Sequence, residues 1–314
     1  MISDTSRLLV IGSEAANVSD RTLGRDNIVS VQSLDSAGNF TPHPAFNAVG
    51  ANGVAAMYYD AQRTRLYYSG GTDLHYIDFA TGAKVRLPVK GLVDAHEMEV
   101  WDGLLWLTST GTDEYITYDP ETGAFDRRHI VEVAQGAPRD KHHLNHIARG
   151  ADGELYGLVH HIDGKQILNQ IKARALKSQG NGGVIRLSDG KRFPLRLHAP
   201  HTVTAVGDEN WVFDSGQASI RIFSADWTPL RAIPTSGWGR GGALYEHGRR
   251  RYFAAGLSNI RQRYQHLFKN YAAFINGVQI FDAETGKQIF CKKIEGVEQI
   301  NNVYVLPAEY VAML

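Results

Sequence analysis

Three histidines recur at one place in three successive repeats of the chain. Each lies ten residues before the aromatic residue of a following strand: His96 before Trp106, His146 before Tyr156, and His201 before Trp211. We expect each histidine to begin the innermost strand of its repeat, so that the three imidazoles converge. Neutral imidazoles suit zinc, iron, copper or nickel better than magnesium or calcium. Manganese is possible but less favoured than those four metals. The spacing therefore predicts a divalent transition metal, bound by three histidines at the mouth of a central channel with positions open for substrate.

Other residues near these positions are candidates for moving protons or holding a substrate. His143 and His198 each precede a member of the set by three residues, and we expect one of them to move a proton. Arg240 lies where the fifth repeat begins and is expected to orient an anionic group. Neighbouring strand residues point to opposite faces, so at most one histidine of each pair, His142–His143 and His160–His161, is expected to face the site.

The chemistry of such a centre leaves several functions open. A metal-dependent lyase or isomerase acting on a small anionic substrate is favoured, because insertions rich in lysine and arginine accompany the site. A non-haem metal oxygenase on the same centre is one alternative. The others are metal-free histidines that bind or turn over a ligand, histidines that only line a channel, and a propeller that binds a ligand or another protein without turnover.

The overall composition excludes other classes of function. The 314 residues carry 33 Lys and Arg against 33 Asp and Glu, whereas a nucleic-acid-binding protein is usually basic. The single cysteine, Cys291, excludes an intrachain disulfide and a cysteine-rich metal cluster. The sequence begins without the pattern of a signal peptide and contains no run of about 18 apolar residues. We therefore expect a cytoplasmic protein without nucleic-acid or membrane partners, and the oligomeric state is left open.

Turn signals recur along the chain at regular spacing. Three turns share the pattern Asp-x-x-Thr-Gly and follow apolar strands: Asp78–Gly82, Asp119–Gly123 and Asp282–Gly286. The Asp and Thr side chains bind nearby backbone amides in such turns, and Gly supplies the positive φ. Hairpin signals such as Trp101–Gly103 and Ala151–Gly153 precede aromatic strands. A four-stranded unit therefore repeats about every forty residues, which is typical of a propeller blade.

These units predict an all-β protein, in which a single domain of residues 1–314 folds as a six-bladed β-propeller. Five blades are expected at residues 51–89, 94–131, 144–194, 199–233 and 241–293. A sixth blade is expected to join the C-terminal strand at 300–306 to N-terminal strands near 7–11, 28–33 and 40. This arrangement closes the ring and removes its exposed edges. Five or seven blades are the alternatives. Insertions at 160–181 and 258–276 are expected to contain helices and to cover the channel face.

Six short segments carry a further signal: His143–Asn145, Gly182–Ile185, Pro200–Thr202, Trp211–Gly216, Gly277–Gln279 and Ile294–Val297. They resemble a bacterial family known only as a domain of unknown function, over residues 90 to 307 or so. The resemblance implies a propeller and supplies no reaction. The family usually has glycine after His-Leu-Asn, where this chain has His146, so a three-histidine centre is expected to be particular to this protein. Some propeller polysaccharide lyases are similar only in the residue types of their sites. They hold a metal on channel histidines and have an Arg or His beside it.

Overall fold

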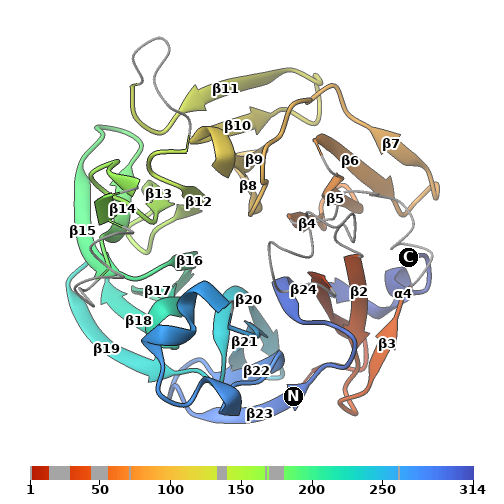
Figure 1. Ribbon diagram of the computed structural model, residues 1–314. Coiled ribbons are helices and arrows are strands. Elements are labelled where there is room, and N and C mark those ends of the chain that lie inside the picture. Colours follow the sequence, from red (N-terminus) through yellow and green to blue (C-terminus); the bar gives the residue numbers. More distant parts are fainter. Residues whose placement is uncertain are drawn as a thin grey trace. The chain divides into compact units, whose positions relative to one another are not determined.

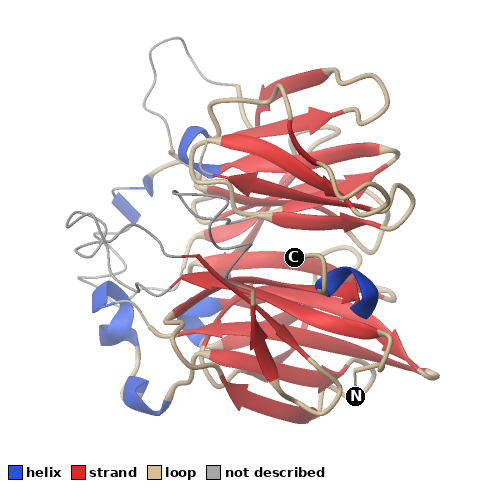
Figure 2. Ribbon diagram, turned by 90° about the vertical axis from the view of Figure 1, so that its right-hand side faces the viewer, coloured by secondary structure: helices blue, strands red, loops and turns tan. Residues whose placement is uncertain are grey.

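Twenty-four β-strands and a few short helices make up the described part of the chain (Figure 1, Figure 2). The computed structural model describes residues 2–13, 29–43, 56–70, 72–132, 140–166, 168–169, 180–260 and 262–314. Its main helical segments are η1 (Thr110–Thr112), η2 (Ser215–Gln217), η3 (Gln262–Leu267), η4 (Tyr271–Ala273) and α4 (Ala308–Val311). Within these residues, no helix has the length and apolar character needed to cross a membrane.

The strands form six four-stranded antiparallel sheets, which are the blades of a six-bladed β-propeller. Contacts divide the chain into two compact units, Met1–Gly91 with Thr235–Leu314 and Leu92–Pro234. The Leu92–Pro234 unit holds three blades, each built from four consecutive strands. These strands are β8 (Met98–Trp101), β9 (Leu104–Ser109), β10 (Glu114–Tyr118), β11 (Phe125–His129), β12 (Leu144–Arg149), β13 (Leu155–Val159), β14 (Gly182–Arg186), β15 (Arg192–Leu197), β16 (Pro200–Val206), β17 (Glu209–Asp214), β18 (Ser219–Ser224) and β19 (Pro229–Pro234).

The other unit contains both ends of the chain and the remaining three blades. In one of these blades the C-terminal strand β24 pairs with β1, in the order β24-β1-β2-β3. This order confirms the prediction that strands from the two termini share a blade. The strands of the unit are β1 (Ser6–Ser13), β2 (Val29–Leu34), β3 (Phe40–Pro42), β4 (Met57–Asp60), β5 (Arg65–Gly70), β6 (Asp73–Asp78), β7 (Lys84–Arg86), β20 (Trp238–His247), β21 (Arg250–Ser258), β22 (Gly277–Asp282), β23 (Gln288–Lys293) and β24 (Gln299–Pro307).

The predicted Asp-x-x-Thr-Gly turns connect the third and fourth strands of their blades. Asp119 accepts backbone hydrogen bonds from Glu121 (2.8 Å) and Thr122 (3.4 Å) through Oδ1. Gly123 has φ +74°, a conformation that glycine adopts without steric cost. Asp78 and Asp282 accept backbone amides in their turns in the same way. The repeated turn is therefore set by local hydrogen bonding and by one glycine.

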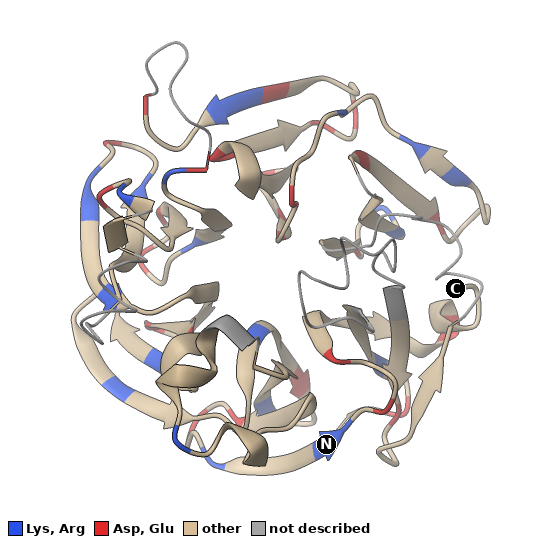
Figure 3. Cartoon of the chain, viewed as in Figure 1, with Lys and Arg blue, Asp and Glu red and all other residues tan. Residues whose placement is uncertain are grey.

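Charged side chains gather on the outermost strand of several blades, while the inner strands are largely buried. Figure 3 shows this on β7 and β11, and the burial pattern of β11 is almost entirely exposed. Apolar residues fill the space between neighbouring sheets within a unit. One such cluster joins β12–β15 to β16–β18 and comprises Ala148, Tyr156, Leu158, Val184, Leu197, Val203, Val212, Phe223 and Trp227. Burial on this scale holds adjacent blades in a fixed register.

The observed blades agree closely with those that the turn pattern predicts. The blade expected at 144–194, for example, has strands from Leu144 to Leu197. Residues 51–55 at the start of one expected blade lie outside the described residues, as do 167 and 170–179 of the insertion at 160–181 and 261 of the insertion at 258–276. The described part of the second insertion contains η3 and η4. Its helical character is therefore as expected.

Candidate metal centre

Four imidazoles of the Leu92–Pro234 unit form a closed ring of contacts, in which each touches two others. His143 contacts His160 with ring centroids 4.5 Å apart, and His160 contacts His201 at 5.5 Å. His96 closes the set, with centroids 5.9 Å from His143 and 6.3 Å from His201. We call these four residues the histidine cluster. His96 and His143 lie just before β8 and β12, His201 lies in β16, and His160 directly follows β13.

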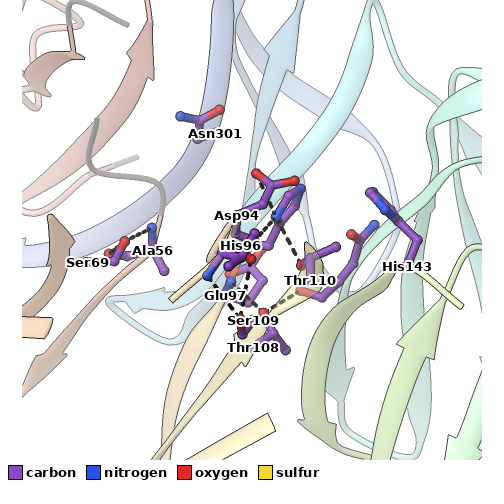
Figure 4. A network of polar contacts seen from close by, with 12 residues as sticks. Ala56, Ser69, Asp94, His96, Glu97, Thr108, Ser109, Thr110, His143 and Asn301 are labelled. Atoms are coloured by element: carbon purple, nitrogen blue, oxygen red, sulfur yellow. Dashed lines mark hydrogen bonds and ion pairs between the residues drawn. The ribbon is translucent and has the colours of Figure 1, made fainter. Parts of the chain in front are cut away.

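The backbone and a threonine hydroxyl hold the ring of His96 (Figure 4). Its Nδ1 lies 2.8 Å from the carbonyl oxygen of Asp94 and 3.2 Å from Oγ1 of Thr110. Thr110 in turn donates its hydroxyl to the carbonyl of Leu144, at 2.6 Å. Because a carbonyl oxygen only accepts, Nδ1 of His96 carries the proton and the lone pair of the ring is on Nε2. The ring therefore offers Nε2 to a metal.

His143 is held in an equally fixed position by two aspartates. Its Nδ1 lies 2.9 Å from Oδ1 of Asp140, and its backbone is left-handed, with φ +56°. Asp113, the residue that follows η1, binds the loop that carries His143. Its carboxylate accepts hydrogen bonds from three backbone N–H groups, those of Lys141, His142 and Leu144, at 2.6, 2.8 and 3.2 Å. An Nδ1–H donor to a carboxylate also places the lone pair of His143 on Nε2.

Asp94, His96 and His143 make a group that is able to hold a metal ion. One ligand atom from each lies within 4.8 Å of the others. The two histidines are half-buried and Asp94 is exposed, so the group is open to solvent on one side. Two imidazole nitrogens and one carboxylate oxygen are a donor set that zinc, iron and other first-row metals accept. The hydrogen bonds at Nδ1 of both rings are those expected of outer-shell partners of metal-bound histidine.

His201 lies beside this group and is itself nearly buried. Its Nδ1 is 2.9 Å from the hydroxyl of Ser215 in η2. The loop before it is fixed by Asp214, whose Oδ1 accepts the backbone N–H of His198 at 2.7 Å. Burial raises the pKa of Asp214 to about 7. Asp214 therefore holds the loop before β16 by accepting a backbone N–H group, as Asp113 does for the loop before β12.

His146 differs from the sequence-based expectation, because the structure does not bring its ring into the histidine cluster. Its Nδ1 accepts the backbone N–H of Val203 at 3.1 Å. The proton of the neutral ring is therefore on Nε2, which lies 3.9 Å from Oε1 of Glu99, too far for a hydrogen bond. Burial lowers the pKa of His146 to about 3 and raises that of Glu99 to about 7. With its lone pair engaged by a backbone amide, His146 has no donor atom for a metal.

Two bulges explain why equal spacing gave different side-chain directions. Strand β12 has its irregularity between Leu144 and His146, whereas β16 has it between His201 and Val203. His146 thus follows the extra residue of its strand, and His201 precedes the extra residue of its own. A shift of one residue turns a side chain to the opposite face. The count of ten residues places both histidines at the same rung but not in the same orientation.

The other two candidates from the sequence lie elsewhere in the structure. The ring of His198 packs against Gly216, where an added Cβ would lie 2.0 Å from its Nδ1. Gly216 is therefore required for the close approach of this ring. Arg240 lies in β20 of the other unit, is 8% exposed, and donates from Nη1 to Oδ1 of Asn301 at 3.1 Å. Their suggested roles, in proton transfer and in holding an anion, stay predictions.

Sequence reasoning missed the part that Asp94, Asp140 and His160 have in the cluster. The short spacings Asp94 to His96 and Asp140 to His143 were available signals, since an aspartate two or three residues away often holds an imidazole. His160 was considered only as one of a pair. Its partnership with His143 and His201 depends on how β12 and β13 meet, which spacing along the chain does not show.

Comparison with known proteins supports the fold. No protein-family model matches the chain, and no curated protein matches it in sequence. A structure of a nidogen/laminin complex matches 96% of this chain and 98% of its own, with a TM-score of 0.60 and 11% identity. A streptogramin B lyase structure matches 85% of this chain and 77% of its own, with a TM-score of 0.52 and 12% identity. The shared feature is the β-propeller.

A further similar structure is that of a luciferin-regenerating enzyme, which covers 77% of this chain and 76% of its own. The TM-score is 0.50 and the identity is 13%. At these identities the likeness establishes the architecture alone, and the chemistry of this chain has to be argued from its own residues. Those residues provide a histidine cluster with a carboxylate beside it.

Proposed function

We propose that this protein is an enzyme that depends on a divalent transition metal and acts on a small anionic substrate by elimination or isomerisation. Asp94, His96 and His143 are the proposed metal ligands, and His201 is the neighbouring base. The observation that carries the proposal is the approach of three ligand atoms to within 4.8 Å of one another. The orientation of both imidazoles by oxygen atoms at Nδ1 supports it.

A metal bound to this group would act as a Lewis acid on an oxygen of the substrate and make a neighbouring C–H group more acidic. The residues around the site would then position the substrate and move its proton. His201 contacts both His96 and His160, and Ser215 holds its Nδ1. An imidazole fixed at one nitrogen is well suited to accept a proton at the other. The role suggested for Arg240, in holding an anionic group, stays a prediction from the sequence alone.

The elimination chemistry has one clear alternative. One of the similar propellers is a streptogramin B lyase, which agrees with a lyase reaction on this fold. A non-haem oxygenase would use the same histidines with iron. The two reactions differ in co-substrate, because only the oxygenase consumes O2. An oxygen electrode therefore distinguishes them when the iron-loaded protein is presented with candidate carboxylate substrates.

Metal content tests the proposal directly. The protein is purified without a chelator or a histidine tag, and metals are quantified by elemental analysis. We expect about one equivalent per chain in the wild type, since a site with outer-shell partners retains its metal. The double variant His96→Ala/His143→Ala is expected to lose at least nine-tenths of it, on the order of a tenfold or larger fall in affinity. Circular dichroism confirms that the β structure is intact.

A matched control uses a histidine of the other unit. His75 in β6 stacks on Tyr68 with centroids 5.2 Å apart and has no part in the cluster. The variant His75→Ala is expected to keep the wild-type metal content. A wild-type protein that is free of metal, and that binds none when offered zinc, iron, manganese, nickel or copper, contradicts the proposal. That result favours a propeller that binds a ligand without turnover.

A further inference from the structure

The amide of Asn145 determines which nitrogen of His160 carries the proton. Nδ2 of Asn145 donates to the carbonyl oxygen of Pro200 at 2.6 Å and lies 2.7 Å from Nε2 of His160. Only the NH2 side of the amide is able to face a carbonyl oxygen, so the contact with Pro200 fixes the orientation of the amide. The second hydrogen of the same NH2 group then points at His160.

The imidazole of His160 must accept this hydrogen bond. Its Nε2 therefore holds the lone pair, and the proton of the neutral ring is on Nδ1. A ring that accepts at Nε2 is neutral and is an N–H donor at Nδ1. His96 and His143 have the same tautomer, with the proton on Nδ1, but in His160 the lone pair on Nε2 is bound by the Asn145 amide.

Within the described residues, Nδ1 of His160 has no protein acceptor, and it is not among the fully buried unpaired atoms. The ring is only partly buried and contacts His143 and His201. It thus presents a donor beside the proposed metal ligands, where a substrate oxygen is expected. A neutral imidazole held as a donor stabilises negative charge on such an oxygen without itself being charged.

We infer that His160 is not a metal ligand but the oxyanion donor of the cluster, and that the substrate is a carboxylate or another oxyanion that places an oxygen at its Nδ1–H. Asn145 is the positioning residue that sets this tautomer. The inference rests on the proposed function and names the substrate class for the same site. Nitrogen NMR of the imidazoles tests it separately from metal content.

The first experiment measures the tautomer and then reverses it. Long-range 1H–15N spectra of the wild type, assigned with His160→Asn, are expected to show the Nδ1–H tautomer at His160 with and without zinc. In Asn145→Asp the carboxylate accepts a hydrogen bond from Nε2, so the lone pair moves to Nδ1 and becomes available as an additional ligand. We expect the zinc affinity of this variant to rise roughly tenfold. A wild-type Nε2–H tautomer overturns the inference.

The second experiment keeps the donor and removes the ring, which covers the case that Asn145→Asp fails to fold. The side-chain amide of asparagine reaches about as far as Nδ1 of histidine, so His160→Asn retains a donor, whereas His160→Phe does not. With oxalate as the probe and zinc-loaded protein, calorimetry is expected to show near wild-type affinity for His160→Asn. His160→Phe is expected to bind oxalate roughly tenfold more weakly.

The two proposals fail in different ways in these measurements. If His160 were a metal ligand, both His160→Asn and His160→Phe would lose zinc. The inference about His160 would then be wrong, and the proposal of a metal centre would still be supported. If the wild type binds no metal, the proposed function fails, and the tautomer in the metal-free protein still tests the role of Asn145. Equal oxalate binding by all three proteins overturns the role of His160 as donor.

Discussion

In both compact units a serine hydroxyl accepts a backbone N–H group near the start of an inner strand. Among the residues that the structure describes, only the Leu92–Pro234 unit also has histidines at these starts. In the unit that contains both termini, the Ser69 hydroxyl accepts the backbone N–H of Ala56 at 3.0 Å, and the Ser258 hydroxyl accepts that of Ile300 at 2.9 Å. In the Leu92–Pro234 unit, the Ser109 hydroxyl accepts that of Val93 at 3.0 Å. Figure 4 shows Ser69 beside Ala56, and also Ser109.

This difference separates what the fold requires from what the site requires. In the unit that contains both termini, the buried apolar residues Ala56 and Met57 lie at the start of the inner strand β4, and no histidine is needed there. The corresponding segments of the other unit carry His96, His143 and His201. Asp94 and Asp140 hold the rings of His96 and His143, and Ser215 contacts the ring of His201. Since blades form without these histidines, their clustering is not explained by architecture. Substitutions in the two units should therefore have different consequences for metal binding, and the following tests compare them pairwise.

The largest effect is expected at Asp113. Asp113→Ala leaves three backbone N–H groups near His143 without their acceptor, which costs about 3 kcal/mol of unfolding free energy. Metal is expected to be lost, because the loop that holds His143 is released. Its counterpart is Asp282→Ala, which removes a carboxylate that accepts the backbone amides of Glu284 and Thr285 in the other unit. Urea unfolding and metal analysis of both variants measure the two effects.

Asp282→Ala is expected to cost about 1 kcal/mol and to leave the metal content unchanged. The comparison of the units breaks down if both variants lose metal to the same extent. It also breaks down if Asp113→Ala retains a full equivalent. Either outcome means that the position of His143 does not depend on Asp113.

An intermediate effect is expected in the pH dependence of stability. Burial lowers the pKa of His146 from 6.5 to about 3 in the folded protein. The unfolded chain therefore binds more protons than the folded one between these values, and the unfolding free energy falls as the pH falls through this range. His146→Asn keeps an acceptor for Val203 and removes the titration. The variant should gain on the order of 2 kcal/mol relative to wild type between pH 6.5 and 4.

His75 is the comparison residue in the other unit. Burial also lowers its pKa, and the carboxylate of Asp73 opposes the shift. The profile for His75→Asn should therefore differ from wild type in the same direction but by less. Urea midpoints measured across this pH range give both differences. Parallel profiles for wild type and His146→Asn would show that His146 is not a buried neutral histidine.

The smallest effect is expected from two hydroxyls. Thr110→Val removes the contact of a hydroxyl with Nδ1 of His96 and its bond to the carbonyl of Leu144. We expect a fall of roughly tenfold in metal affinity, the lower end of outer-shell effects. Ser69→Ala removes a hydroxyl that accepts the backbone N–H of Ala56 and should cost about 1 kcal/mol without changing metal affinity. Competition titrations with a chromophoric chelator measure both affinities.

The blades were predictable from the sequence because each is set by local chemistry. The turn at Asp119–Gly123 contains its own hydrogen-bond acceptors and its positive-φ glycine, so its sequence is sufficient to place it. Strand ends were predicted to within a few residues for the same reason. The pairing of the two chain ends followed from the number of strands left over. Each of these inferences uses contacts between residues close in sequence or a simple count.

The site was less predictable because it depends on contacts between strands. His96 and His201 were identified by spacing, and the structure brings their rings to 6.3 Å. The direction of His146 depends on which side of a bulge it lies, and nothing in the sequence marks the bulged residue. His160 is brought to His143 by the meeting of β12 with the connection after β13. These facts become visible only once the register is known.

X-ray absorption at the K-edge of the bound metal tests the central claim most directly, namely that imidazoles of the Leu92–Pro234 unit hold a transition metal through Nε2. The metal is the one that elemental analysis identifies, and the sample is wild-type protein purified without a chelator. We predict nitrogen ligands at about 2.0–2.1 Å for zinc, with the outer-shell scattering of at least two imidazoles. This scattering should decrease in His143→Asn and persist in His75→Asn. A spectrum with oxygen ligands alone, or one unchanged by His143→Asn, would contradict the account.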